Sequence, residues 1–145
     1  MKNEEILRLD NQICFPMYVA SKEIVRQYIP LLKELDLTYT QYITLLALWE
    51  NDHITVKELG SRLYLDSGTL TPLLNKLENK GYIIKNKSDK DGRELVVCVT
   101  DEGFKLKEKA LSIPQNIAKC VHLEREEAIE FYRLLHKVLD GFYGK

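Results

Sequence analysis

Residues 54–100 constrain the fold more than any other part of the chain. Near their start, Thr55 is followed three residues later by Glu58, the spacing of a capping box in which the side chain of each residue binds the backbone amide of the other. A capping box marks the start of a helix. This one predicts a short helix from Val56 to residue 63 or 64.

A second helix is predicted immediately after the first. Asp66 and Ser67 are both favourable N-cap residues, and Lys80 followed by Gly81 is a typical helix end. Between these boundaries, leucines recur at helical spacing at positions 70, 73, 74 and 77. One face of this helix is therefore expected to be buried and the other to be polar.

A hairpin follows the second helix. Tyr82–Lys87 and Glu94–Val99 are rich in β-branched and aromatic residues, and the turn chemistry of Ser88–Gly92 lies between them. Helix, turn, helix and hairpin in this order predict a winged helix-turn-helix. In such a unit the second helix enters a major groove of DNA and the hairpin tip touches an adjacent minor groove.

The remaining segments are predicted as helices with one apolar face. A long N-terminal helix is expected to be capped by Asp10 or Asn11, and a helix from Thr38 to about Asn51 opens with another capping box. Thr100 is expected to cap a further helix, which the proline at position 114 should kink. The fold class is mainly α with a small β-hairpin wing, in a single domain over residues 1–145. A winged helix-turn-helix core at 37–100 is flanked by dimerisation helices at 1–36 and 101–145.

The last helix suggests how the flanking helices are used. Its apolar residues alternate steps of four and three, as in the seam of a coiled coil, at Ala128, Tyr132, Leu135, Leu139 and Phe142. We therefore expect a homodimer, although the same helices can also close the core of a monomer. A two-fold dimer presents its two recognition helices about 34–36 Å apart, which predicts a pseudo-palindromic site on double-stranded DNA.

The cations gather where DNA is expected. The net charge of the chain is only -1, but residues 76–93 hold six Lys/Arg (76, 80, 85, 87, 90, 93) against three Asp/Glu (78, 89, 91). In the recognition helix, short polar side chains suit base edges. The candidate DNA-contacting residues are Asp66, Ser67, Thr69, Thr71, Asn75, Lys76, Lys90 and Arg93.

Composition narrows the class of protein. The chain has 145 residues, of which 45% are hydrophobic, and it has no apolar run of about 18 residues that would suggest a membrane helix. The polar N-terminus does not resemble a signal peptide, and three cysteines indicate reduced thiols in a cytoplasm. No phosphate loop, hydrolase motif or metal-ligand spacing appears, so we expect no cofactor and no metal.

Cys14 is the candidate reactive residue. Pro16 is best tolerated early in a helix, which places Cys14 in or near the first turn. There the free amides and the helix dipole stabilise a thiolate, the form that attacks a peroxide. Phe15, Met17 and Tyr18 would add an apolar surround that favours an organic hydroperoxide over hydrogen peroxide. The alternative is that Cys14 is a small buried hydrophobic residue.

The chain resembles a known family at several motifs. The motifs LYLDSGTLTPLLNKLE and DKDGRELVVCVTDEG are similar to the multiple-antibiotic-resistance regulator (MarR) family of bacterial repressors, over nearly the whole chain. The motifs LDNQICFPMY, YIPLLKELDLTYTQYITLLALWE and LDSGTLTPLL resemble its organic-hydroperoxide-resistance regulator (OhrR) subgroup. Pro16 departs from the pattern, because a residue that continues the helix is expected there.

The resemblance implies roles for particular residues. In that subgroup the cysteine corresponding to Cys14 is the peroxide-reactive thiol, the tyrosines corresponding to Tyr28 and Tyr39 reach it from the partner subunit, and Tyr18 lies beside it. Two-cysteine members carry a resolving thiol in their C-terminal part, which makes Cys120 either a resolving cysteine or a packing residue. Cys98 alternates with valines on a strand and is expected to be structural.

The sequence thus predicts a homodimeric repressor, not an enzyme, that releases its operator when an organic hydroperoxide oxidises Cys14. Two alternatives remain open. One is a repressor of the same fold that a small aromatic ligand releases, with Cys14 incidental. The other is a thiol peroxidase in which Cys14 turns over.

Overall fold

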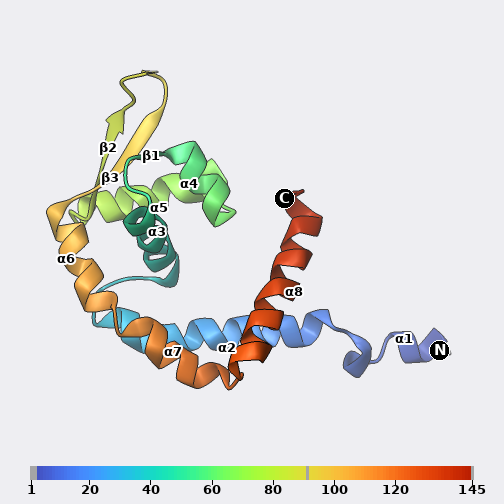
Figure 1. Ribbon diagram of the computed structural model, residues 1–145. Helices are drawn as coiled ribbons and strands as arrows, with labels where there is room; N and C mark the ends of the chain where they lie inside the picture. The colour runs from blue at the N-terminus through green and yellow to red at the C-terminus, as the bar shows by residue number, and fades with distance from the viewer. Residues whose placement is uncertain (1–2, 91, 145) are drawn as a thin grey trace.

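The computed structural model describes residues 3–90 and 92–144. The three strands lie together with α3, α4 and α5, and α2 and α7 lie below this part (Figure 1). Its elements in chain order are α1 (Asn3–Ile6), the 3-10 helix η1 (Leu9–Asn11), α2 (Cys14–Lys33), α3 (Tyr39–Glu50), β1 (Ile54–Thr55), α4 (Val56–Leu63), α5 (Ser67–Asn79), β2 (Ile83–Lys87), β3 (Leu95–Val99), α6 (Asp101–Ala110), α7 (Ile113–Val121) and α8 (Arg125–Tyr143).

Both predicted capping boxes are confirmed. The Thr38 side chain accepts a hydrogen bond from the backbone amide of Gln41, whose own side chain binds the amide of Thr38. Thr55 and Glu58 make the same reciprocal pair at the start of α4. Each cap satisfies amides that a helix start leaves open, a contribution of about 1 kcal/mol to helix stability.

The expected boundaries of α5 are also confirmed. Asp66 is the N-cap, and its carboxylate accepts a hydrogen bond from the amide of Thr69 at 2.8 Å. The four leucines of the predicted stripe are all buried. After the helix, Gly81 adopts a φ of 82°, a left-handed conformation that glycine enters at little cost.

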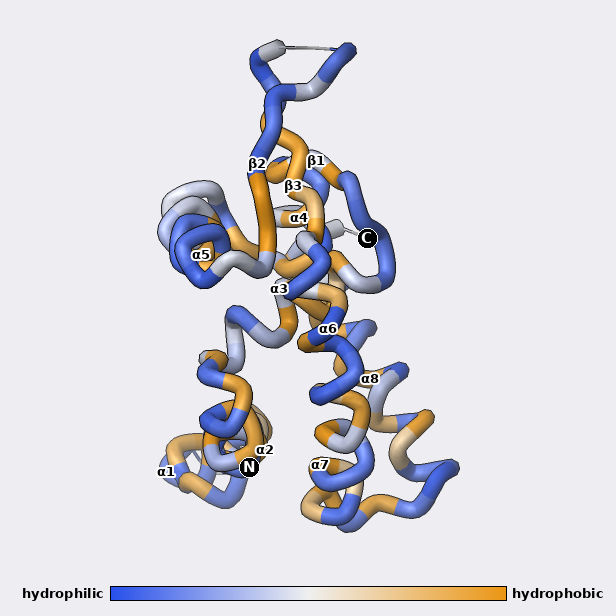
Figure 2. The backbone as a smooth tube through the Cα atoms, turned by 90° about the vertical axis from the view of Figure 1, so that its left-hand side faces the viewer, coloured by the Kyte–Doolittle hydropathy of each residue, from blue (hydrophilic) through white to orange (hydrophobic). Residues whose placement is uncertain are grey.

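The wing has one strand more than the sequence predicted. β2 and β3 form the expected hairpin, but β1 pairs with the other edge of β3, giving a three-stranded antiparallel sheet in the order β1-β3-β2. Ile54 lies opposite Val97, and Ile83 lies opposite Val99. Figure 2 shows the hydrophilic tip of the wing extending beyond the apolar part of these strands.

Two predictions about helices are wrong. Asp10 and Asn11 lie in η1, and the residue before α2 is Ile13, which makes no side-chain cap. The helix that Thr100 caps does not continue through a kink at Pro114. It ends at Ala110, and α7 begins at Ile113 with the proline in its first turn, where the missing amide costs little.

The helices outside the wing differ in how they pack. α2 lies beside α7 (Figure 1), and the Leu32 side chain of α2 joins the core. α8 runs back toward α4, and the rings of Tyr143 and Tyr64 lie 4.6 Å apart between centroids. No residue of α8 is buried, although it carries large apolar side chains. Among the described residues, no helix is both long enough and apolar enough to cross a membrane.

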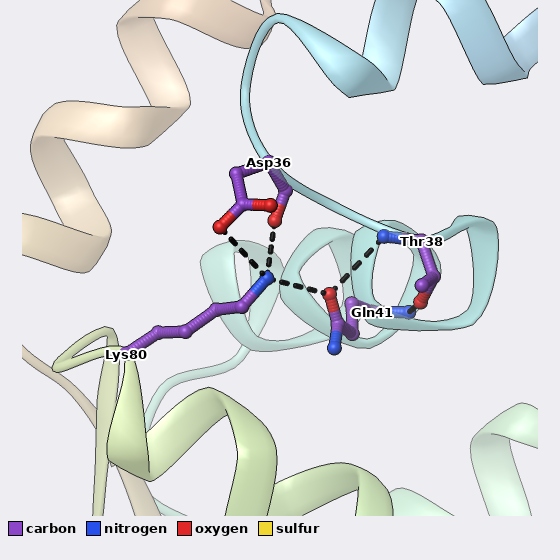
Figure 3. A network of polar contacts seen from close by, with 4 residues as sticks. All are labelled: Asp36, Thr38, Gln41 and Lys80. Carbon is purple, nitrogen blue, oxygen red and sulfur yellow. Dashed lines mark hydrogen bonds and ion pairs between the residues drawn. The ribbon is translucent and has the colours of Figure 1, made fainter.

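A polar junction connects the loop between α2 and α3 with the start of α3 and the end of α5 (Figure 3). The Lys80 ammonium at the end of α5 donates to the backbone oxygen of Asp36, lies 3.4 Å from the carboxylate of that residue and donates to Gln41 Oε1 at 3.3 Å. Gln41 is only 3% exposed, and the same oxygen accepts the Thr38 amide at 3.1 Å. The cap of α3 is therefore also an anchor for the recognition helix.

Candidate functional site

Cys14 is the first residue of α2, and its thiol is free and exposed. Ile13 before it offers no side-chain cap, and Pro16 has no backbone N–H. The first turn of α2 therefore carries no acidic side chain beside the thiol. The expected position of Cys14 at the helix start is confirmed, and the protomer itself does not bury the thiol.

Exposed apolar side chains follow Cys14 in the first turns of α2. Phe15 and Met17 are both exposed, and Tyr18, one helical turn after Cys14, is 63% exposed. The ammonium of Lys22 lies 5.4 Å from the centre of the Tyr18 ring. The protomer alone leaves this apolar surface in water, so a partner is needed to enclose the thiol.

Tyr28 and Tyr39 meet in one aromatic cluster. Their ring centroids lie 4.9 Å apart, and Tyr42 joins them at 5.7 Å from Tyr28. Burial and then the neighbouring Tyr39 and Tyr42 raise the pKa of Tyr28 to about 12, and burial raises the pKa of Tyr39. Both hydroxyls therefore remain protonated at neutral pH and can donate hydrogen bonds.

The cluster does not lie beside Cys14 of the same protomer. Both Cys14 and Tyr28 belong to the continuous helix α2, fourteen positions apart. At 1.5 Å per residue, that separation is about 21 Å along the helix axis. A thiol and a tyrosine of this kind can meet only between two protomers.

Cys120 lies near the end of α7 and is exposed. Its sulfur is 3.9 Å from Gln27 Oε1 on α2 and 3.5 Å from the backbone oxygen of Asn116, beside a hollow of about 300 Å³. Gln27 is thirteen positions from Cys14, or about 20 Å along α2. Because a disulfide needs Cα atoms within about 7 Å, Cys14 and Cys120 of one protomer cannot pair.

Cys98 differs from the other two cysteines. It is buried on β3, and burial, with a further effect of Asp52, raises the pKa of its thiol. Both causes disfavour the thiolate that reacts with peroxides. Its expected structural role is consistent with this position.

The predicted DNA-contacting residues of α5 share its exposed side. The exposed residues are Ser67, Thr69, Thr71, Asn75 and Lys76. Asp66 is exposed as well, but its carboxylate is already used as the cap of α5. The structure therefore brings these residues together on a surface that carries no core contact.

The wing adds two further predicted residues. Lys90 and Arg93 are both exposed, and Arg93 lines a hollow of about 430 Å³ together with Ser67 at the start of α5. Lys57, in the first turn of α4, lines the same hollow and was not among the predicted contacts. Its place next to Arg93 depends on β3 folding back over α4, which no local sequence signal reveals.

Metal binding has no support in the described part of the chain. No group of three or more histidine, cysteine and acidic side chains there is arranged to hold an ion. His53 instead pairs with the carboxylate of Asp52 at 3.0 Å.

Comparison with known proteins identifies the family. Residues 26–110 match the family model described as transcriptional regulator SarA/Rot. The chain is 42% identical to the organic hydroperoxide resistance transcriptional regulator of Bacillus subtilis over 139 residues, which cover 96% of this chain and 95% of that protein.

Solved structures of similar regulators have the same fold as this chain. The fold is similar to that of reduced AbfR bound to DNA, with a TM-score of 0.80 and 34% identity over 99% of both chains. Against the disulfide form of AbfR, which is 33% identical, the TM-score is 0.65 over 98% of this chain and 97% of that one. AbfR is a protein of Staphylococcus epidermidis. This chain belongs to the MarR family of winged-helix transcriptional regulators, in the group that includes the organic hydroperoxide resistance regulator.

Proposed function

We propose that this protein is a homodimeric repressor that binds DNA when reduced and releases it when an organic hydroperoxide oxidises Cys14. The observation that carries the proposal is the exposed Cys14 thiol at the start of α2, followed along the helix by apolar side chains that the protomer leaves uncovered. We place the protein in the cytoplasm, where thiols stay reduced.

The DNA-bound state uses α5 and the wing. Ser67, Thr69, Thr71 and Asn75 face the major groove, while Arg93 at the wing reaches a minor groove. Lys76 and Lys90 contact phosphates and make affinity fall with salt. The higher similarity to reduced, DNA-bound AbfR than to its disulfide form supports this state for the structure described here.

The dimer encloses the sensor. α8 and the first half of α2 carry exposed apolar residues, which a second copy of the chain would cover. Residues 1–36 and 101–145 then act as dimerisation helices around the core at 37–100. In that arrangement Tyr28 and Tyr39 of one protomer donate hydrogen bonds to Cys14 of the other, consistent with their raised pKa values.

The redox step is a two-electron oxidation of sulfur. The Cys14 thiolate attacks the outer oxygen of ROOH, so that an S–O bond forms while the O–O bond breaks. The alkoxide takes a proton and leaves as the alcohol ROH. The thiol of Cys120 in the other protomer then attacks the sulfenic acid, giving an S–S bond and water, because the pair within one protomer is about 20 Å apart. The disulfide moves α2 against α7 of the partner and changes the separation of the recognition helices.

The test is a gel shift with DNA from upstream of the coding sequence, with and without cumene hydroperoxide. Reduced protein should bind, and about one equivalent of oxidant per subunit should release it. Cys14→Ser is the matched control, because it keeps the shape of the side chain but has no oxidisable thiolate; it should bind and stay bound. Release of that variant by peroxide would transfer the sensing role to another cysteine.

The same assay separates the alternatives. Release by salicylate but not by peroxide would identify a repressor controlled by an aromatic ligand. Continued consumption of peroxide in the presence of a reductant would identify a thiol peroxidase. Absence of any DNA binding by reduced protein would contradict the repressor function itself.

A further inference from the structure

Asn75 on the exposed side of α5 is held by the wing. The ammonium of Lys85, on β2, donates a hydrogen bond to the Asn75 side-chain oxygen Oδ1. This contact joins a recognition-helix residue that faces solvent to a strand residue ten positions later in the chain. Neither its existence nor its direction follows from the sequence pattern of α5.

Lys85 is itself fixed by Glu78. The backbone amide of Lys85 donates to Glu78 Oε2 at 3.0 Å, and its ammonium lies 3.8 Å from Glu78 Oε1. The Lys85 side chain is only 17% exposed, so water competes little for these contacts. Asn75, Lys85 and Glu78 thus form a closed set that links one turn of α5 to β2.

The chemistry of this set determines which end of the Asn75 amide faces outward. An ammonium has donors and no acceptor, so only the amide oxygen can face Lys85. The amide nitrogen Nδ2 then points to the other side, and within the described residues no side chain or backbone group binds it. The Asn75 oxygen is therefore turned toward β2, and the end of the amide that faces away from β2 presents hydrogen-bond donors.

A donor-only asparagine reads bases differently from a free one. A free asparagine binds adenine with both ends, accepting from N6 and donating to N7. With its oxygen turned toward Lys85 on β2, Asn75 is poorly placed to make the first of these bonds. Guanine, which shows two acceptors at O6 and N7, becomes the best match, and cytosine, which shows only a donor, the worst.

We propose that Lys85 and Glu78 are specificity-determining residues that fix Asn75 as a donor, so that the operator carries guanine where Asn75 meets a base. The proposal rests on the DNA-binding function proposed above. Lys85 acts through Asn75 as a positioning residue, and its role differs from that of a cation that only contacts phosphate.

The test selects binding sites from a randomised duplex library with the reduced full-length protein. Wild type should select guanine at one position of each half-site. Lys85→Met frees the Asn75 oxygen and should move the preference at that position toward adenine by on the order of tenfold, the effect of one good two-bond contact. Asn75→Asp keeps the contact with Lys85 but turns an acceptor outward, so it should select cytosine at the same position.

Two matched variants control for charge and folding. Lys87→Met removes an equal charge from the same strand and should weaken binding to all sequences without changing any base preference. Lys85→Arg retains a donor for Asn75 and should select the same operator as wild type. Equal thermal unfolding of Lys85→Met and wild type establishes that the variant is folded.

The possible outcomes distinguish a failure of this inference from a failure of the proposed DNA-binding function. If wild type enriches no sequence, the DNA-binding function fails. If wild type enriches an operator and Lys85→Met enriches the same bases at every position, Lys85 contributes charge alone and the inference is overturned.

Discussion

Gly103→Ala should destabilise the protein although it replaces a helical glycine by the best helix former. Gly103 lies in the first turn of α6. A methyl group added there would lie 2.3 Å from the backbone oxygen of Tyr82 and 2.7 Å from Val99 Cγ1. Ordinary contacts of such a carbon lie beyond 3.4 Å, and the first obstacle is backbone, so α6 must move away from the root of the wing.

The magnitude follows from what that movement disrupts. The Tyr82 oxygen accepts the Thr100 amide at 3.0 Å, and the Gly103 oxygen accepts the indole N–H of Trp49 at 3.0 Å. Overpacking costs about 1–3 kcal/mol, and each lost hydrogen bond about 1 kcal/mol. The gain in helix propensity offsets at most about 1 kcal/mol. The net loss in free energy of unfolding should be about 2–4 kcal/mol.

Urea unfolding followed by fluorescence measures this loss directly, since the single tryptophan, Trp49, binds the displaced residue. With a slope of about 2 kcal/mol per molar urea, the midpoint should fall by about 1–2 M at fixed protein concentration. Gly141→Ala is the matched control, because Gly141 is also helical but an added methyl group meets nothing within 4 Å in the protomer. It should keep or raise the midpoint. A Gly103→Ala midpoint at or above that of wild type would refute the reasoning.

Four further outcomes are expected. Arg93→Ala should weaken operator binding by about 1–3 kcal/mol in a fluorescence anisotropy titration, and unchanged affinity would remove Arg93 from the interface. Cys120→Ser should abolish the covalent dimer band that stoichiometric peroxide produces on a non-reducing gel; if wild type gives no such band, Cys120 is a packing residue. The pKa of Tyr28 rises from 10.0 to about 12 on folding, so the free energy of unfolding should fall as the pH increases from about 10 to 12. In Tyr28→Phe this fall should be less steep, and urea midpoints measured across that pH range will show the difference. Lys80→Met should lower the free energy of unfolding by about 1 kcal/mol through the lost contacts to Asp36 and Gln41, whereas the exposed Lys109→Met should change it little.

The parts of the fold that the sequence predicted correctly depend on neighbours along the chain. The capping boxes at Thr38 and Thr55 join residues three positions apart, and the stripe of leucines in α5 repeats within one helix. By contrast, β1 is two residues long and exists because Ile54 pairs with Val97 across the domain. Pairing over such a distance leaves no periodic signal in so short a segment.

The features of the candidate sites also divide into those set by neighbours along the chain and those set by packing between distant segments. The exposure of Ser67 and Thr71 follows from the face of α5 opposite its leucines, and the early position of Cys14 follows from Pro16. The contact of Lys85 with Asn75 depends on how β2 packs against α5. Charge counts detected that Lys85 belongs to a basic segment, but not that it has a specific partner.

The geometry of α2 links sensing to dimerisation. The helix is continuous from Cys14 to Lys33, so it holds Cys14 about 21 Å from Tyr28 of the same chain. The sequence placed the tyrosines beside the thiol only through resemblance to a family, whereas the straight helix gives a physical reason why they must come from another copy. In the proposed dimer, one protomer therefore supplies the thiol and the other supplies the hydrogen-bond donors that reach it. Because the proposed disulfide also spans two protomers, the proposal has oxidation act on the subunit interface itself and change the spacing of the two α5 helices without any change inside the winged core.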